Sequence, residues 1–301
     1  MDKKKQNPKV SVILPIYNVE KFIPFALESL INQTLKDIEI ICVDDCSTDN
    51  SLKVAQQYAL KDNRIVVIQQ DKNMGEVVAK HAGALIAQAD YIGTLDPDDW
   101  VSLNFYEEMY KNITTAQADI AYCSYQITKE NGALRNKFVN YPNITNLINT
   151  TINELNPGTT NKLIKKSIFL NGVNFTERDI WKDLYQYWRA YSNNNYKSVY
   201  VEDILYFYRQ RKSSIMHTKE PIKTDYNKLL TTLDLIAQYL IKNKRYKLYA
   251  SALWQKTEML TKKKLNKNIF RKLYFKQFKK ELISIAHKNQ IPLEDLNCVL
   301  K

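Results

Sequence analysis

Short apolar runs alternate with amphipathic stretches along the first hundred residues of this chain. Continuous apolar runs predict buried strands at residues 10–16, 38–43, 65–68 and 91–95. Apolar residues at helical spacing predict helices at 22–31, 52–58 and 75–87. Strand and helix pairs that recur at intervals of about 25 to 30 residues favour right-handed crossovers. The pattern therefore predicts an α/β domain with a mainly parallel sheet between helices.

The pattern is sparser beyond residue 100. It predicts a helix at 101–112, a strand at 120–128 and a last strand at 200–211. Residues 219–301 then show helical periodicity, with aromatic residues among lysines. We therefore expect an α/β domain over residues 1–218, followed by a helical extension over 219–301.

Carboxylates gather where two of the predicted strands end. Asp44 and Asp45 follow the second strand, and Asp96, Asp98 and Asp99 follow the fourth. The carboxyl ends of parallel strands form the ligand-binding edge of an open α/β sheet. Like charges at this spacing favour a shared cation, and carboxylate oxygens suit Mg²⁺ or Mn²⁺. The alternative is a surface loop whose aspartates end a strand and cap the following helix.

Glycine-rich phosphate loops are missing from the sequence. The chain has six glycines and contains neither GxGxxG nor GxxxxGK[ST]. Backbone amides approach a pyrophosphate closely only through such loops. Any phosphates are therefore expected to be held by a metal ion and by side chains, which suits a sugar nucleotide better than a dinucleotide.

Five motifs in the first hundred residues together carry a family resemblance. They are Val12–Asn18 (VILPIYN), Ser29–Thr34 (SLINQT), Glu39–Asp49 (EIICVDDCSTD), Asn73–Gly75 (NMG) and Leu95–Trp100 (LDPDDW). Their order and spacing resemble the family 2 glycosyltransferases with the GT-A fold. The resemblance implies a nucleotide-sugar half at residues 1–100 and an acceptor half at 101–218. It also implies inverting transfer from a nucleoside-diphosphate sugar, usually a UDP-sugar, with Mn²⁺ or Mg²⁺ as cofactor.

The resemblance also assigns roles to residues of these motifs. Pro15 and Tyr17 would border the uracil, and Asp45 or Asp44 would hydrogen-bond it. Asp96 would face the ribose and the metal, and Asp98 would be the main metal ligand. The other nucleotide-sugar candidates are Asn18, Glu20, Asn73, Gly75, Lys80, Arg209 and Arg211. Lys80 stands where the family commonly has arginine, which keeps the charge and loses the bidentate fork.

The catalytic base of the family lies on a helix that typically opens with Glu-Asp. Here the corresponding pair is Lys182-Asp183, so Asp183 matches the base, while Asp179 lies one helical turn earlier and is the alternative. His217 is a further metal candidate, because a histidine follows the last strand in some GT-A enzymes. Lys162 precedes the predicted acceptor-side helix and is expected to line the site.

Net charge divides the chain. The formal net charge is +12, and residues 219–301 hold 19 lysines and arginines against 7 acidic residues. A basic amphipathic extension favours binding to the anionic inner leaflet of a bacterial membrane. The alternative is an ordinary solvated helical bundle, through which the chain could also form an oligomer.

No targeting segment is evident near the start of the sequence. The first apolar run is seven residues long and contains Pro15, too short for a signal peptide or a membrane span. The four cysteines have no zinc spacing, which favours free thiols in a reducing compartment. The expected location is cytoplasmic, peripheral on the inner face of the membrane.

Three functional classes follow from these patterns. The first is implied by the resemblance, which extends to bacterial transferases that build lipooligosaccharide, lipopolysaccharide or capsule glycans, including β-1,3-galactosyltransferases. It is an inverting hexosyltransferase that moves galactose, glucose or N-acetylhexosamine to a bacterial surface glycan. The acceptor is expected to be lipid-linked. The second is a sugar-binding scaffold with a degenerate site, which would account for Lys80 and Lys182. The third is a basic nucleic-acid-binding protein, which leaves the acidic strand ends unexplained and has no recognised binding motif.

Overall fold

The computed structural model describes residues 7–145, 158–171 and 196–211, with a few single residues between 276 and 292. Its strands are β1 (Val10–Ile16), β2 (Ile38–Asp44), β3 (Ile65–Gln69), β4 (Tyr91–Thr94), β5 (Trp100–Val101), β6 (Ile120–Thr128), β7 (Leu134–Val139), β8 (Lys162–Lys165) and β9 (Ser198–Arg209). Its helices are α1 (Ile23–Ile31), α2 (Ser51–Ala59), α3 (Glu76–Ile86), α4 (Phe105–Thr115) and α5 (Lys166–Asn171).

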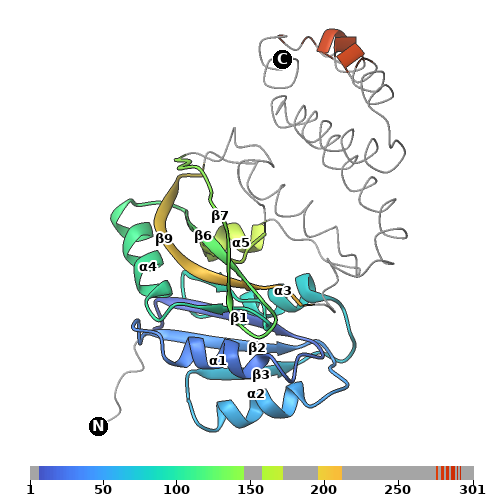
Figure 1. The fold of residues 1–301 in the computed structure, drawn as a ribbon, viewed down its shortest axis with the longest axis vertical. Coiled ribbons are helices and arrows are strands. Elements are labelled where there is room, and N and C mark those ends of the chain that lie inside the picture. Colours follow the sequence, from blue (N-terminus) through green and yellow to red (C-terminus); the bar gives the residue numbers. More distant parts are fainter. Residues whose placement is uncertain are drawn as a thin grey trace.

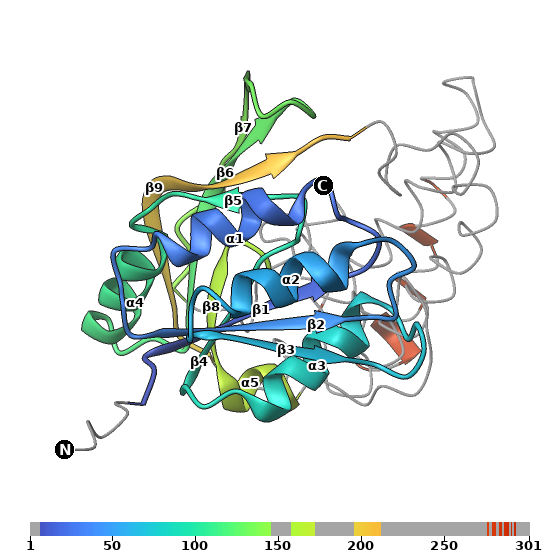
Figure 2. The ribbon, with the colours of Figure 1, turned by 90° about the horizontal axis from the view of Figure 1, so that it is seen from below.

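These strands form one sheet with helices on both faces. The strand order is β3-β2-β1-β4-β8-β6-β9-β5, and β7 pairs with β6 outside this path. Figure 2 shows α1 and α2 on one face of the sheet and α3 and α5 on the other. Successive side chains of β1 point to opposite faces of the sheet. Val12 and Leu14 pack toward α1 and α2, whereas Ile13 packs toward α3. Burial on both faces explains the continuous apolar runs of the sequence.

The first four long strands are parallel and confirm the predicted α/β architecture. Strand β1 pairs in parallel with both β2 and β4, and β2 pairs in parallel with β3. Their carboxyl ends therefore share one edge of the sheet. Beyond β4 the sheet is mixed, because β8 runs antiparallel to β4 and to β6 while β9 runs parallel to β6. Figure 1 shows β9 alongside β6. The prediction of a mainly parallel sheet is therefore confirmed for the strands of the first hundred residues, and the later strands make the sheet mixed.

The helix predicted from residue 101 begins later. Trp100 and Val101 form the short strand β5 against β9, and the Ser102 amide donates to the Leu205 carbonyl at 2.9 Å. Trp100 also stacks on Phe207, with ring centroids 5.4 Å apart and an interplanar angle of 6°. This pairing with a strand a hundred residues away keeps the segment extended until α4 starts at Phe105. Asp96, Asp98 and Asp99 are therefore followed by the strand β5, so they do not cap a helix.

Candidate active site

The carboxyl edge of the parallel strands brings the predicted acidic residues together. Strand β2 ends at Asp44, and β4 ends at Thr94, just before Asp96, Asp98 and Asp99. The two strands flank β1, whose carboxyl end leads directly to Tyr17. Tyr17 is 42% exposed, so its ring is available to stack on a planar ligand, whereas Pro15 is buried within β1. This edge combines an exposed ring with several carboxylates.

Asp45 fixes the loop that leads into α3. Its Oδ1 accepts from the Met74 amide at 2.7 Å and from Gln70 Nε2 at 3.2 Å, and its Oδ2 accepts from the Gly75 amide at 2.7 Å. Gly75 has φ 91°, a left-handed conformation that favours glycine. The predicted residues Asp45 and Gly75 therefore meet, and Asp45 holds the loop at the edge of the sheet.

Asp44 and Asn73 each keep a buried acceptor oxygen beside this loop. Asp44 is fully buried and accepts from the Ser47 amide at 3.2 Å through Oδ2. Its Oδ1 and the Oδ1 of Asn73 have no hydrogen-bond partner in the described part of the chain. A buried acceptor without a partner is costly, which makes both atoms candidates to accept from a ligand N–H or hydroxyl.

Asn18 and Glu20 hold two loops of this edge together. Asn18 Oδ1 accepts from the Thr48 amide at 2.8 Å, and Glu20 Oε2 accepts from the amide and the side chain of Asn50 at 3.0 and 2.9 Å. The loop after β1 is thereby tied to the loop after β2. These two predicted site residues thus support the wall of the site through their side chains.

Asp96 belongs to a charged cluster with two residues of α3. Lys80 Nζ lies 3.0 Å from Asp96 Oδ1 and also contacts Glu76 Oε1, one turn earlier on the helix. Removal from water raises the pKa of Asp96 to about 7; the Lys80 ammonium opposes the rise, and the Glu76 and Asp98 carboxylates add to it. The Asp96 side chain is 29% exposed and therefore reachable. Glu76 was missed in the sequence, although its spacing to Lys80 is that of a helical ion pair.

Asp98 is paired with a different cation. Arg211 Nε lies 2.6 Å from Asp98 Oδ2, and the Arg211 guanidinium lies over the ring of Phe22 at 4.9 Å. Desolvation raises the pKa of Asp98, and the charge of Arg211 opposes that rise. The structure thus brings Asp96, Asp98, Lys80 and Arg211 together at this edge of the sheet, and their roles stay predictions.

Asp99 and Arg209 together lock the aspartate loop to β9. Asp99 is buried and accepts from the Tyr206 hydroxyl at 2.5 Å and from the Arg209 amide at 2.7 Å. Arg209 Nε donates to the Asp98 carbonyl at 2.7 Å, and the guanidinium lies 4.7 Å from the centre of the Trp100 ring. Arg209 is 3% exposed, so its present contacts are those of a structural clamp rather than of a phosphate ligand.

Tyr206→Phe is expected to lower the free energy of unfolding by about 1–3 kcal/mol, because it leaves a buried carboxyl oxygen without its donor. Urea unfolding followed by circular dichroism measures this difference. Tyr58→Phe is the matched control, because the Tyr58 hydroxyl donates to the exposed Glu28 carboxylate at 3.0 Å. Loss of this exposed hydrogen bond is expected to lower the free energy of unfolding by less than about 0.5 kcal/mol. Equal losses in the two variants would contradict the clamp.

The donor set at Asp96 and Asp98 fits Mg²⁺ or Mn²⁺. Both carboxylates are partly exposed, and desolvation raises the pKa of both, which is the environment that a bound cation would relieve. No three potential ligands among His, Cys, Asp and Glu gather as a metal site in the described residues. Mg²⁺ sites in proteins commonly use one or two carboxylates together with substrate phosphates and water.

Lys162 is buried at the same edge. It opens β8, is 1% exposed, and lies 3.3 Å from Asn161 Oδ1 and 5.9 Å from the centre of the Tyr141 ring. Burial lowers the pKa of Lys162 to about 7, and the nearby Cys123 opposes the shift. The sequence predicts that Lys162 lines the site, and the structure places it beside Tyr141, in a cluster of tyrosines that includes Tyr122 and Tyr200.

Lys162→Met is expected to stabilise the protein near pH 7 and to flatten its pH dependence. Between pH 7 and the ordinary lysine pKa, the unfolded chain binds the proton that native Lys162 lacks, so stability rises with pH by up to about 1.4 kcal/mol per unit. Below pH 7 both states are protonated and the burial cost is complete. Urea unfolding at pH 6.5 and pH 9 measures the slope. Lys111→Met, at a lysine side chain 70% exposed, is the control. An unchanged slope in Lys162→Met would contradict a buried neutral lysine.

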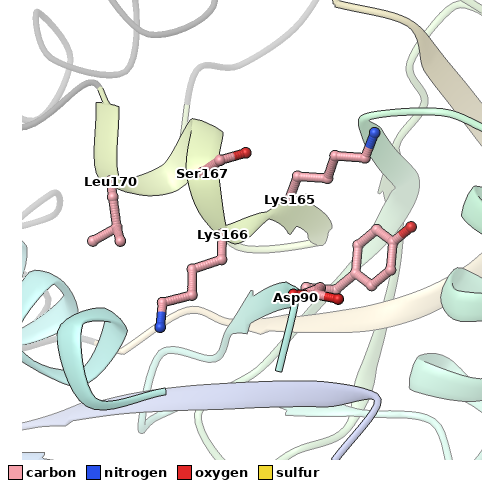
Figure 3. Close-up of a pocket in the computed structure, with 6 residues that line it drawn as sticks. Asp90, Lys165, Lys166, Ser167 and Leu170 are labelled. Carbon is pink, nitrogen blue, oxygen red and sulfur yellow. The ribbon is translucent and has the colours of Figure 1, made fainter. Parts of the chain in front are cut away.

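A pocket of about 490 Å³ lies away from this site, where β4 begins and β8 ends (Figure 3). It is lined by Asp90, Tyr91, Lys165, Lys166, Ser167 and Leu170. Figure 3 shows Lys165 and Lys166 pointing in different directions. Their ammonium groups are engaged by Asp119 Oδ1 at 2.7 Å and by the Ala87 carbonyl at 2.5 Å. The pocket therefore offers no convergent charged groups.

Several predicted features lie outside the described residues. They are Asp179, Asp183, Lys182, His217 and most of the basic extension. In the part of the chain that is described, no helix is long and apolar enough to cross a membrane.

Comparison with protein families identifies the chain. The model of glycosyl transferase family 2 matches residues 11–172, which include both aspartate loops. This chain belongs to that family. GlyG, a glycosyltransferase of Streptococcus pneumoniae, is 33% identical over 223 residues, or 70% of this chain and 73% of GlyG. The resemblance predicted from the five motifs is confirmed.

One further relative and one solved structure each match most of the length of this family 2 glycosyltransferase. The cholesterol galactosyltransferase of Borreliella burgdorferi is 28% identical over 297 residues, 92% of this chain and 82% of that protein. The crystal structure of Staphylococcus aureus TarS 1–349 with UDP-GlcNAc has a TM-score of 0.71 and 20% identity, and covers 97% of this chain and 90% of that one. The likeness confirms the GT-A fold. GlyA of Streptococcus pneumoniae and EpsJ and EpsH of Bacillus subtilis match over 17%, 34% and 34% of their own length.

Proposed function

We propose that this glycosyltransferase moves a sugar from a UDP-sugar to a hydroxyl of a bacterial surface glycan, with inversion at the anomeric carbon. The observation that carries the proposal is the meeting of Asp96 and Asp98 with the exposed ring of Tyr17 on one sheet edge. An exposed ring suits a pyrimidine base, and two hard carboxylates suit a cation on a diphosphate. The TarS structure, which holds UDP-GlcNAc, supports a UDP-sugar donor.

The nucleotide half of the site supplies the donor contacts of this proposal. Tyr17 stacks on the uracil, and Asp44 or Asp45 accepts from its imide N–H. Asn73 accepts from a donor hydroxyl through its free Oδ1. Asp96 and Asp98 hold Mn²⁺ or Mg²⁺, which when bound supplies positive charge beside the leaving diphosphate. Lys80 keeps Asp96 in place through their 3.0 Å contact.

The acceptor half supplies the base. The acceptor oxygen bonds to the anomeric carbon while the bond from that carbon to the phosphate oxygen breaks, and the UDP leaves with the electron pair. The proton of the acceptor hydroxyl passes to Asp183, or to Asp179 in the alternative register. The donor sugar is galactose, glucose or N-acetylhexosamine, and the acceptor is a lipid-linked glycan such as a lipooligosaccharide core. Galactose has the support of the cholesterol galactosyltransferase relative.

Nucleotide binding separates this proposal from its rivals. We expect calorimetry to show UDP binding in the presence of Mn²⁺, with weaker binding of GDP, ADP and CDP. A degenerate scaffold would bind UDP without turning over a UDP-sugar, and a nucleic-acid-binding protein would prefer an oligonucleotide. Absence of UDP binding at millimolar concentration with Mn²⁺ present would overturn the donor assignment.

We also propose that the basic extension brings the enzyme to an anionic membrane surface. The excess of twelve positive charges lies in residues 219–301. Well-placed cations contribute up to about 1 kcal/mol each at such a surface, and salt screens that attraction. We expect the full chain to co-sediment with anionic vesicles at low salt and to detach as salt rises. Equal sedimentation with neutral phosphatidylcholine vesicles would contradict an electrostatic membrane contact.

A further inference from the structure

Each of the two candidate metal ligands, Asp96 and Asp98, already forms an ion pair with a basic side chain of the protein. Lys80 Nζ lies 3.0 Å from Asp96 Oδ1, and Arg211 Nε lies 2.6 Å from Asp98 Oδ2. A divalent cation shared by these carboxylates must compete with the resident cations for the negative charge. How firmly each resident cation is held decides which of them gives way.

Lys80 is the more firmly held of the two. It lies within α3, its side chain is 5% exposed, and its ammonium group contacts Glu76 as well as Asp96. Glu76 is carried by the same helix, so the pair moves as one unit. Displacement of Lys80 from Asp96 would separate a buried ammonium from a carboxylate that balances its charge, which is unfavourable.

Arg211 contacts one carboxylate among the described residues, whereas Lys80 contacts those of Glu76 and Asp96. It stands two residues beyond the end of β9, and its side chain is 19% exposed. Its described contacts are the carboxylate of Asp98 and the face of Phe22, at 4.9 Å from the ring centre. The neighbouring Arg209 anchors the strand end by itself, through the carbonyls of Asp98 and Glu130 at 2.7 Å each. Arg211 can therefore turn away without loosening the clamp.

We infer that Arg211 is a built-in counter-ion of Asp98, which a divalent cation displaces and which then turns onto the diphosphate of the donor. This inference rests on the proposed function. Oxygen ligands of Mg²⁺ or Mn²⁺ lie at about 2.0–2.2 Å, so diphosphate oxygens that share the cation with Asp98 lie within about 5 Å of its carboxylate. The Arg211 guanidinium, already against that carboxylate, reaches these oxygens by side-chain rotation alone. Its planar fork suits phosphate oxygens.

If this exchange occurs, removal of Arg211 changes the affinities for Mn²⁺ and for UDP in opposite directions. Without Arg211, Asp98 has no resident cation, so Mn²⁺ alone binds more tightly. The diphosphate loses its guanidinium, so UDP binds more weakly once Mn²⁺ saturates the site. A purely structural role for Arg211 would weaken both. When one ligand changes the affinity for another, the change is typically about 5-fold to 150-fold.

The test measures Mn²⁺ binding to the full chain by the loss of the free Mn²⁺ signal in electron paramagnetic resonance, without nucleotide. Arg211→Gln is expected to bind Mn²⁺ about fivefold more tightly than the wild type, and to bind UDP about fivefold or more weakly at saturating Mn²⁺. Arg211→Lys keeps the charge and is expected to retain the Mn²⁺ affinity of the wild type while losing UDP affinity. Lys165→Gln, which removes the ion pair to Asp119 at the other edge of the sheet, is the control.

Two results would overturn the inference in distinguishable ways. If the wild type binds Mn²⁺ through Asp98 and Arg211→Gln leaves that affinity unchanged or weaker, the exchange is wrong and the metal site stands. If neither the wild type nor any variant binds Mn²⁺, with or without UDP, the proposed metal site itself fails and the exchange fails with it.

Discussion

Replacement of Asp98 by asparagine is expected to abolish metal-dependent UDP binding while leaving the chain folded. Asparagine has the same size, and the backbone carbonyl at this position still accepts from Arg209 Nε. The lost charge removes the main proposed metal ligand. The expected loss of UDP affinity in Mn²⁺ is roughly a hundredfold or more, since even supporting residues around metals contribute 10-fold to 100-fold.

Calorimetric titration of UDP with Mn²⁺ and with EDTA measures this loss, and far-ultraviolet circular dichroism checks the fold. Asp119→Asn is the matched control, because its ion pair with Lys165 lies at the opposite edge of the sheet. UDP binding that neither EDTA nor Asp98→Asn changes would show that the carboxylate serves packing rather than a cation.

Replacement of Asp183 by asparagine is expected to abolish sugar transfer and to spare UDP binding. A general base acts on the acceptor hydroxyl rather than on the diphosphate, and its removal typically costs about 100-fold to 10,000-fold in rate. The assay compares turnover of the UDP-sugar with UDP affinity in the same preparation. Near-normal turnover in Asp183→Asn together with loss in Asp179→Asn would place the base one helical turn earlier.

The parallel half of the fold is predictable because its signal is local. Strands β1, β2 and β4 are covered on both faces of the sheet, so their residues are apolar in continuous runs that the sequence shows directly. The aspartates that follow them are placed by the shared direction of the strands. The acidic edge and its exposed Tyr17 therefore follow from residue order alone.

The rest of the site depends on distant partners. Asp99 bonds Arg209 across 110 positions, and Trp100 pairs with Phe207, so neither contact has a local signal. These contacts decide that residue 100 begins a strand instead of a helix, and that Arg209 is buried as a clamp. The strand β7 was also missed, because its residues are exposed and lack an apolar run. Asp183 and His217 lie outside the described residues and stay predictions.

The most direct test of the account is release of UDP from UDP-galactose, UDP-glucose and UDP-N-acetylglucosamine, measured in Mn²⁺ buffer with membrane-extracted glycolipid as acceptor. The account predicts that at least one of these donors is consumed, that EDTA stops the reaction, and that Asp98→Asn and Asp183→Asn each lower the rate by roughly a hundredfold or more. UDP release at the same rate in EDTA and in both variants would contradict a metal-dependent sugar transfer at this site.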